Sequence, residues 1–384
     1  MASAPRLRLI ATMLSCALLP SVFAAQETLV VRSSVVLPPE IGKRLGEVNS
    51  RVSCGADGSI TIALSDHPLN SPSPIGKLSS DGILLAQIDF AQVPGFEKGI
   101  VEDFAPGPHG ETYVVGNALL GGTPETGLDY DPTLTLLRFD ATGRLIARLA
   151  LTRRIAHSRM AVFASGDALI VGLAVDGPHR GRSLAAIVSS EGVLLRESHL
   201  PQLLTDREPT YNAAHQAKTK SPMLIPMITD DDRIAILREG KTGALVYVSN
   251  TLEVSSVTRL KHPPGTSVRA PAVLGPDWLF AILDPPTPPR TRANYVRFNL
   301  QDGEIMATYP IPTTISGSGC KSSDGIQFFD IVHGTLNVMV PAANVVPGEP
   351  ASRNQDEPAV KRAVGAGLCN CWGCGAHLGF GLLL

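Results

Sequence analysis

The stretch SSDGILLAQI, from Ser79 to Ile88, is the most informative part of the sequence, because its pattern occurs three more times along the chain. The related stretches are DATGRLIARL from Asp140, SSEGVLLRES from Ser189 and LQDGEIMATY from Leu300. Each consists of a polar turn, a glycine and an apolar segment. These segments alternate or are wholly apolar, whereas a helix would place apolar residues three and four positions apart. The repeated element is therefore predicted to be a turn followed by a β-strand.

Three further strands are predicted before each of these turns. In the second unit the four strands are GIVEDFA, ETYVVGN, TLTLLRFD and GRLIARLAL. A short turn that contains Gly or Asp separates the first two strands of a unit. Six such turns are found, at residues 56–58, 108–110, 165–167, 230–232, 275–277 and 332–334. The units recur every 50 to 60 residues or so, a spacing typical of propellers and similar arrays.

Six units of four strands predict an all-β protein, a six-bladed β-propeller over residues 25–346, because ring closure hides the sheet edges that an open array exposes. In the last unit, GIQFFDI and TLNVMV are expected to be the first two strands, and PAVKRAV, residues 358–364, could be the third. The segment TLVVRSSVVL, Thr28 to Leu37, is rich in β-branched residues. It is predicted to complete the last blade and close the ring.

The repeated units resemble bacterial six-bladed propellers of the NHL-like and TolB-like kind, over nearly the whole mature chain. The resemblance implies the fold and no particular activity. The chain has no WD dipeptide or kelch signature, and SSDGILL lacks the spacing and the aromatic residue of a sialidase-like Asp-box.

Composition sets further limits on function. Charged residues make up 18% of the chain, the formal net charge is -2, and no block of basic residues occurs, which argues against a nucleic-acid partner. Glycine (36 residues) and proline (31 residues) are abundant, as expected for short strands joined by tight turns.

The first 24 residues are predicted to be a cleavable signal peptide. They contain Arg6 and Arg8, then an apolar run, then small residues up to Ala24. The alternatives are a membrane anchor, for which the run is short, and a lipoprotein modified at Cys16. The expectation is therefore an exported protein, periplasmic or extracellular, with no transmembrane segment in the mature chain.

Three polar insertions interrupt the repeat and are the predicted interaction surface. They are Ala118 to Thr133, Pro201 to Pro222 and Asp284 to Arg292. Long loops on a rigid scaffold are common sites of binding. The main functional hypothesis is a binding or scaffold module that engages a peptide, glycan or protein partner through loops on one face; the sequence leans against an enzyme without deciding the question.

A metal-dependent hydrolase is the alternative, with its site at the mouth of the central channel. Glu102 and Asp103 are adjacent on an inner strand, so at most one of them faces the channel, and Asp330 is expected late in the sixth inner strand. The segment LGEVNSRV, around Glu47, is similar to the LGEGP segment of gluconolactonase-like propellers, in which this glutamate binds the catalytic metal. Here Val48 and Asn49 replace Gly-Pro, and the tryptophan expected soon afterwards is missing.

The cysteines predict no disulfide framework. Cys54 is expected at the end of an inner strand and Cys320 before another, near the opposite rim. A strand of five or six residues spans about 17 to 20 Å, whereas bonded cysteines need Cα atoms within about 7 Å. The prediction is that the two do not bond and that the core holds without a covalent link.

The C-terminal segment, residues 347–384, does not fit the blade pattern. It is predicted to be a polar linker followed by a poorly ordered tail rich in glycine and cysteine. Cys369, Cys371, Cys374 and His377 have enough soft ligands for zinc, although a bridge between two of the cysteines is the stronger alternative. No cofactor is predicted, and a divalent metal remains the one cofactor hypothesis.

Overall fold

A computed structural model describes most of the predicted propeller. The described residues are 25–37, 50–55, 58–64, 74–80, 83–96, 99–118, 133–174, 182–200, 224–229, 231–285, 293–310, 318–322, 325–332 and 334–342. Their regular elements are strands, apart from the short 3₁₀ helix η1, Phe90–Gln92. A helix with the length and apolar character to cross a membrane is not found among them. The predicted signal peptide and the tail from residue 347 lie outside this part of the chain.

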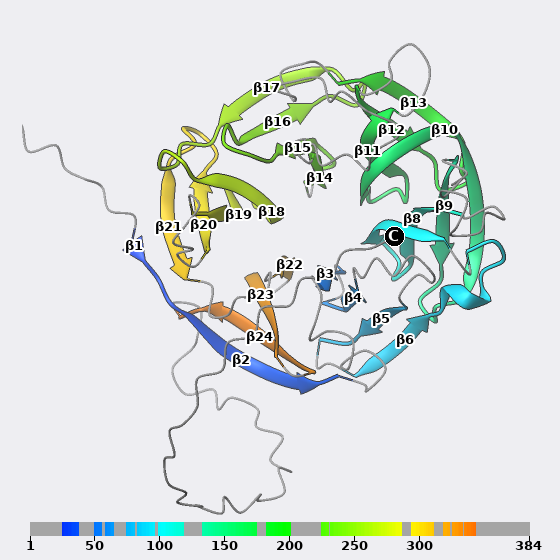
Figure 1. The fold of residues 1–384 in the computed structure, drawn as a ribbon, viewed down its shortest axis with the longest axis horizontal. Coiled ribbons are helices and arrows are strands. Elements are labelled where there is room, and N and C mark those ends of the chain that lie inside the picture. The colour runs from blue at the N-terminus through cyan, green and yellow to red at the C-terminus, as the bar shows by residue number, and fades with distance from the viewer. Residues whose placement is uncertain are drawn as a thin grey trace, which may run out of the picture.

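The strands form six blades arranged in a ring, as predicted (Figure 1). Each blade is an antiparallel sheet of four strands that runs from the centre of the ring to its rim. The innermost strands of blades one to six are β3 (Ser50–Cys54), β7 (Ile100–Pro106), the second half of β10 (Leu145–Val162), β14 (Leu224–Ile228), β18 (Ser267–Leu274) and β22 (Ser318–Ser322).

The remaining strands follow in the same order of blades. The second strands are β4 (Ile60–Leu64), β8 (Thr112–Asn117), β11 (Ala168–Ala174), β15 (Ile234–Arg238), β19 (Trp278–Asp284) and β23 (Gly325–Val332). The third strands are β5 (Ile75–Leu78), β9 (Thr133–Phe139), β12 (Ser183–Val188), β16 (Ala244–Val248), β20 (Asn294–Asn299) and β24 (Thr335–Pro341). The outer strands are β6 (Leu84–Ile88), the first half of β10, β13 (Leu194–His199), β17 (Val254–Arg259), β21 (Ile305–Pro310) and β2 (Leu29–Val36).

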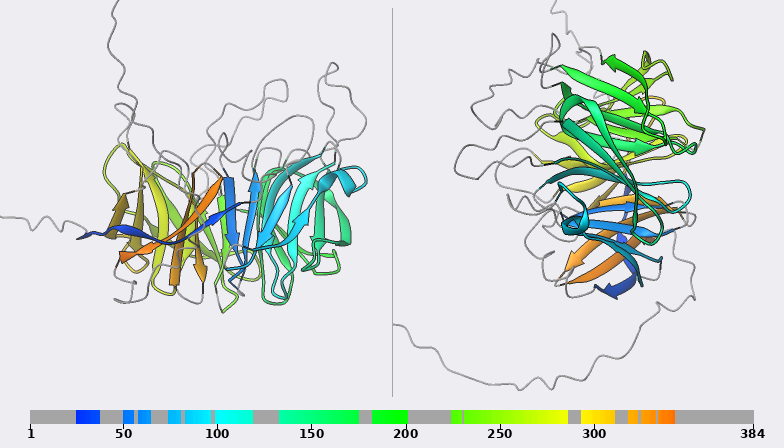
Figure 2. Two further views of the ribbon diagram at one scale, coloured as in Figure 1. Left: turned by 90° about the horizontal axis from the view of Figure 1, so that it is seen from below. Right: turned by 90° about the vertical axis from the view of Figure 1, so that its right-hand side faces the viewer.

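The alternation of strand direction gives the ring two different faces (Figure 2). The turns from first to second strand, and in blades one to five also the turns from third to outer strand, lie at one end of the blades, which we call the turn face. The connections from second to third strand, and the links to the next blade, lie at the other end, which we call the loop face. The inner strands begin at the loop face and end at the turn face.

The repeat that opens the sequence forms the turn between third and outer strands. A polar side chain at its first position accepts hydrogen bonds from backbone N–H groups further along the turn. In blade two Asp140 Oδ1 accepts from the N–H groups of Thr142 and Arg144, both at 3.0 Å. The residues in the corresponding position of blades one, three, four and five are Ser79, Ser189, Ser249 and, directly before the stretch quoted from Leu300, Asn299; each accepts in the same way. The recurring glycine follows because its position needs a positive φ, as at Gly143 (82°) and Gly192 (86°).

The N-terminal strand closes the ring, as predicted. β2 pairs antiparallel with β24, with Val35 opposite Leu336. β2 thus supplies the outer strand of blade six, and in Figure 1 it runs along the rim beside β24. A second N-terminal strand, β1 (Ala25–Gln26), pairs in parallel with β21, the outer strand of blade five.

The predicted strand assignment in blade six is wrong by one position. The inner strand is β22, so GIQFFDI is the second strand and TLNVMV the third. The turn at 332–334 joins the second and third strands rather than the first two. Residues 358–364 lie outside the described residues, and the strand that pairs with β24 on its outer side is β2. The error arose because SGCKS, at Ser318–Ser322, has no apolar pattern typical of a strand.

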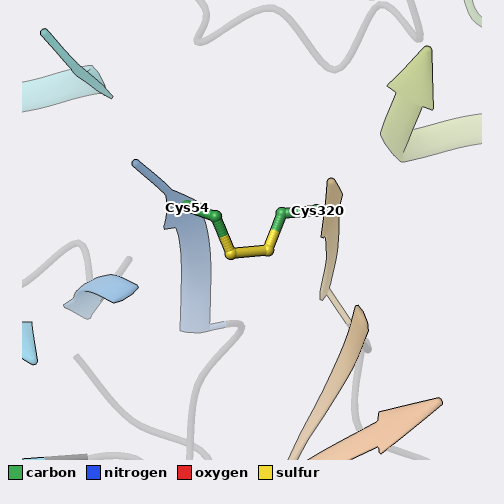
Figure 3. Close-up of a disulfide and its surroundings, with 2 residues drawn as sticks. All are labelled: Cys54 and Cys320. Atoms are coloured by element: carbon green, nitrogen blue, oxygen red, sulfur yellow. A yellow bond between two sulfur atoms is a disulfide. The ribbon is translucent and has the colours of Figure 1, made fainter. Parts of the chain in front are cut away.

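The prediction that Cys54 and Cys320 do not bond is also wrong, as is the expectation of a core without a covalent link. The two cysteines form a disulfide, and their Cα atoms are 5.7 Å apart (Figure 3). Cys320 lies within the inner strand of blade six rather than before it, and β22 lies beside β3. The disulfide therefore joins the first blade to the last, across 266 positions of sequence.

The core consists of apolar clusters between neighbouring blades. The described residues form six such clusters, one at each interface of the ring. The cluster between blades six and one contains Val52 and Ile62 from one side and Phe329 and Val338 from the other. The last blade thus packs on the first as every other blade packs on its neighbour, which buries the faces that an open array would expose.

Candidate functional site

The loop face carries the strand ends that the three predicted insertions join. β8 and β19 are second strands and β13 is an outer strand, and strands of both kinds end at this face. Their last residues are Asn117, Asp284 and His199. The insertions themselves, at 119–132, 201–223 and 286–292, lie outside the described residues. The topology nevertheless requires all three to start and finish at the same face of the ring.

Asp103 holds two blades together. It lies on β7, is 1% exposed, and its Oδ2 accepts a hydrogen bond of 2.8 Å from the backbone N–H of Met160 on β10. Its Oδ1 is 2.6 Å from the N–H of Phe104. The register of β7 shifts between Val101 and Asp103, which turns this carboxylate towards blade three. Asp103 therefore satisfies backbone donors between blades two and three.

Glu102 occupies the bulged position beside Asp103. It is partly exposed, and its carbonyl oxygen accepts a hydrogen bond of 2.8 Å from Arg159 Nη1. Arg159 lies on the inner half of β10, in the next blade. The two residues bring charges of opposite sign to neighbouring inner strands.

Asp330 lies on a different strand from the one predicted. It is on β23, the second strand of blade six, rather than on the inner strand, and it is 7% exposed. Phe328, two residues before it on the same face of β23, packs on Tyr295 of blade five, with ring centroids 4.4 Å apart. Asp330 therefore faces the interface between blades five and six and not the central channel.

Tyr295 lies close enough to Asp330 for the two side chains to interact electrostatically. Its hydroxyl is buried and makes no hydrogen bond within the described residues. Burial raises the pKa of Tyr295, the charge of Asp330 raises it further, and Arg269 opposes the rise. The hydroxyl thus stays protonated, and it is enclosed within the interface between blades five and six.

An ion pair lies beside this tyrosine. Arg269 Nε on β18 is 2.5 Å from Asp284 Oδ2 on β19, and both side chains are about one-third exposed, at 35% and 34%. Asp284 ends its strand at the loop face and begins the third insertion. Arg269, Asp284, Tyr295 and Asp330 form a polar cluster between blades five and six, which we call the interblade cluster.

A metal centre is not assembled by the described residues. No three His, Cys, Asp or Glu side chains among them are grouped so that they could hold a metal ion. Glu102, Asp103 and Asp330 are thus not brought together into such a group. The other predicted ligands, Glu47 and the set Cys369, Cys371, Cys374 and His377, lie outside the described residues.

Most of the interblade cluster has no signature in the sequence. Asp284 could have been found, because it borders a predicted insertion. Tyr295 and Arg269 occur singly within apolar strands, where nothing marks them as neighbours of Asp330. Their meeting depends on which face of each strand points towards the next blade.

Comparison with known proteins adds no activity to this picture. No model of a known protein family matches the chain, and no curated protein matches it. A solved structure of a protein of unknown function from Bacteroides caccae is 12% identical, with 68% of this chain and 86% of that chain covered and a TM-score of 0.43. A second, a protein of unknown function from Dyadobacter fermentans, is 10% identical, with 82% and 99% covered and a TM-score of 0.49.

The strands themselves place this chain among the six-bladed β-propellers. The fold by itself suits a binding or scaffold module, because it presents many loops on a rigid frame.

Proposed function

We propose that this protein is an exported propeller that binds a peptide, glycan or protein partner through the loops of its loop face. The observation that carries the proposal is the topology of the insertions: the three strand ends at which they start lie on the same face. Variable loops on a fixed frame can change their ligand without changing the fold, which is why binding surfaces are so often built this way.

The interblade cluster lies at the same face and supports this choice. Asp284 connects it directly to the third insertion, and solvent can reach the ion pair that Asp284 forms with Arg269. Polar groups of this kind fix the orientation of a ligand that loops hold in place.

Export is part of the proposal, and the disulfide between Cys54 and Cys320 supports it. Structural disulfides form and persist in oxidising compartments, whereas cytosolic thiols are kept reduced. The signal-like N-terminal segment points to the same compartment. Detection of the mature chain, cleaved after Ala24, in a periplasmic or culture-medium fraction would test this part.

Loop replacement tests the binding function. We would replace residues 119–132, 201–222 and 286–292, in three separate variants, with short Gly-Ser linkers and screen each variant against a glycan array and a phage-displayed random peptide library. A ligand selected on the wild type should lose binding to at least one loop variant. Ala141→Ser, on the turn face, is the matched control and should bind as the wild type does. If every correctly folded loop variant retains full binding, the loop face is not the site.

The hydrolase hypothesis predicts metal binding and catalytic turnover, which the binding proposal does not require. Calorimetric titration with calcium, zinc and manganese, followed by a screen of lactone and ester substrates, would give tight metal binding and turnover if it were correct. We do not propose it as a second function, since no arrangement of the described residues favours it. Turnover that disappears in a Glu102→Gln or Glu47→Gln variant would replace the binding proposal.

A further inference from the structure

A pocket of about 370 Å³ lies on the turn face, between blades four and five. Its lining includes Arg233, Tyr247, Asn250, Ser256 and Leu300. Arg233 lies in the turn between β14 and β15, Asn250 in the turn between β16 and β17, and Leu300 in the turn between β20 and β21. The pocket is therefore at the opposite end of the ring from the three insertions and from the interblade cluster.

Hydrogen bonds within the turns hold the walls of this pocket in place. Ser249 Oγ accepts from the N–H groups of Thr251 and Glu253, at 3.3 and 3.2 Å, which fixes the turn that carries Asn250. Thr258 Oγ1 donates to the carbonyl oxygen of Leu300 at 3.2 Å and so joins blade four to blade five. The walls of the pocket therefore belong to two blades that this hydrogen bond connects.

An aromatic ring and a guanidinium group form one side of the pocket. The guanidinium carbon of Arg233 lies 5.6 Å from the centre of the Tyr247 ring, and Arg233 Nε is 2.8 Å from Asp231 Oδ2. The ion pair orients the guanidinium group and leaves its terminal N–H groups available as donors. Tyr247 is partly buried, and desolvation is the largest cause of the raised pKa of its hydroxyl, which therefore remains protonated.

Three polar groups of the lining lack partners within the described residues. The Tyr247 hydroxyl, the Asn250 amide and the Ser256 hydroxyl make no hydrogen bond there. Ser255 and Ser249, which also line the pocket, are already engaged, Ser255 with the carbonyl oxygen of Tyr247 at 3.1 Å. The unengaged groups belong to side chains that both donate and accept hydrogen bonds.

This pattern favours hydroxyl groups over anions. A hydroxyl also donates and accepts, so it can satisfy Tyr247, Asn250 and Ser256 fully, whereas an inorganic anion accepts only. The Tyr247 ring and Leu300 offer apolar surface of the kind that packs on the C–H face of a sugar. The volume lies at the lower end of the range for small-molecule sites, about 300 to 1,000 Å³, which suits a ligand of one sugar unit.

We propose that the pocket between blades four and five is a saccharide-binding site that takes a single hexose-sized unit, neutral or uronic. The hydroxyls of the sugar bond to Asn250, Ser256 and the Tyr247 hydroxyl, and one face of the sugar ring packs on Tyr247. Arg233 donates to a ring oxygen or, in a uronic acid, to the carboxylate. This site is additional to the proposed partner surface on the loop face and does not depend on it.

Saturation-transfer NMR with glucose, galactose, N-acetylglucosamine and glucuronate, on the intact mature chain, tests the proposal. At least one sugar should receive saturation from the wild type. Its Kd should rise about tenfold or more in the double variant Asn250→Ala, Ser256→Ala, because two hydrogen bonds to ligand are lost. Both side chains are exposed, so the variant keeps the fold, as circular dichroism would verify. Tyr247→Phe should weaken binding less, because it keeps the aromatic face.

Arg196→Ala is the matched control. Arg196 is an exposed residue of β13 that pairs with Ile187 as Ser256 pairs with Tyr247, one blade away from the pocket. It should bind sugar as the wild type does. The proposal is overturned if none of the four sugars binds, if the double variant binds as tightly as the wild type, or if inorganic sulfate competes fully for the site.

The variants with replaced loop-face insertions distinguish sugar binding at the pocket from partner binding at the loop face. Those variants should bind the sugar unchanged, because the two surfaces are at opposite ends of the ring. Loss of partner binding with sugar binding intact would support the loop-face proposal alone, and the reverse pattern would support the pocket alone.

Discussion

At Leu252, burial of the side chain favours a backbone conformation that is itself unfavourable. It occupies the turn position that glycine holds at 143, 192 and 303, and its φ of 64° is unfavourable for a residue with a Cβ atom. The side chain is 1% exposed, within the apolar cluster between blades three and four. Burial of a leucine contributes about 2 to 3 kcal/mol, whereas the left-handed backbone costs about 1 to 2 kcal/mol. Burial wins, so the turn forms without glycine.

Gly303 cannot be replaced in the same way. Its φ is 75°, and a Cβ atom there would lie 1.9 Å from the carbonyl oxygen of Arg259. Gly303→Ala should lower the free energy of unfolding by about 3 kcal/mol, through backbone strain together with a shift of β17. Gly58→Ala is the control, because Gly58 has a φ of 77° but its Cβ would meet only Ser80, at 3.7 Å. Urea unfolding that gave equal losses for the two variants would contradict the role of the clash.

Asp140 should titrate well below its ordinary range. The hydroxyl of Thr142, 2.6 Å from Oδ1, is the largest cause, followed by the N–H of Arg144, and together they lower the pKa of Asp140 from 3.8 to about 2. Since the folded pKa is below the unfolded one, the carboxylate favours folding above pH 3.8, and this contribution is lost as the pH falls towards 2.

Thr142→Val tests this assignment of cause. The pKa of Asp140, measured by carbon-13 NMR of its carboxyl group, should rise towards 3.8 but stay below it, because the backbone donors remain. Thr229→Val, which removes the corresponding hydroxyl from Asp231, should leave Asp140 unchanged. An unaltered Asp140 pKa in Thr142→Val would show that the backbone alone sets it.

Among the strands, β10 and β2 each connect parts of the ring that other strands leave separate. β10 is 18 residues long and pairs with β9 through its first part and with β11 through its second, so it is the outer strand of blade two and the inner strand of blade three. β2 comes from the N-terminus and completes the blade built from the C-terminus. Both couple neighbouring blades through backbone hydrogen bonds rather than through side-chain packing alone.

Removal of β2 should open blade six. A chain that lacks residues 25–37 exposes the outer edge of β24 and loses Leu37, which is 3% exposed in the cluster between blades six and one. The thermal midpoint should fall by about 10 °C or more, as expected for a loss of several kcal/mol. A synthetic peptide of residues 28–37 should restore part of the loss at high concentration, because strand addition at a free edge is favourable.

A peptide of the same composition in scrambled order is the control. It should not rescue, since it breaks the alternation that places Val35 opposite Leu336. If the truncated chain were as stable as the full one, β2 would not close the ring energetically.

At the scale of the whole molecule, the disulfide and β2 fasten the same closure in two ways. β2 joins the N-terminus to the rim of blade six, and the disulfide joins the inner strands of blades one and six. β2 stabilises the folded state through its hydrogen bonds in the sheet. The disulfide acts mainly on the unfolded chain, because it excludes conformations in which two residues 266 positions apart in sequence are separated in space.

Loss of the disulfide should therefore be costly. For a loop of this length the chain-entropy account gives about 5 to 6 kcal/mol as an upper limit, and native disulfides typically contribute about 2 to 5 kcal/mol. The double variant Cys54→Ala, Cys320→Ala should lose a free energy of unfolding within that range, measured with urea. Reductant should lower the stability of the wild type to a similar level and leave the double variant unchanged. A wild type unaffected by reductant would contradict the assigned link.

The sequence alone determined the repeating part of this protein. Polar turn residues, the glycine that follows them and the apolar strands act on near neighbours, so each turn and hairpin could be inferred from a few consecutive residues. The number of blades and the closing role of Thr28 to Leu37 followed, because unpaired strand edges must be hidden. The same reasoning identified the insertions, and chain topology then assigned them to one face.

The contacts between distant segments became visible only in the folded ring. SGCKS becomes an inner strand because blade one and β23 flank it, although its own residues do not mark it as a strand. That one shift placed Cys320 beside Cys54 and moved Asp330 from the channel to Tyr295. The pocket between Tyr247 and Leu300 likewise exists only because two blades pack side by side. Local patterns specify a blade, but the contacts between blades depend on the closed ring, in which residues far apart in sequence become neighbours.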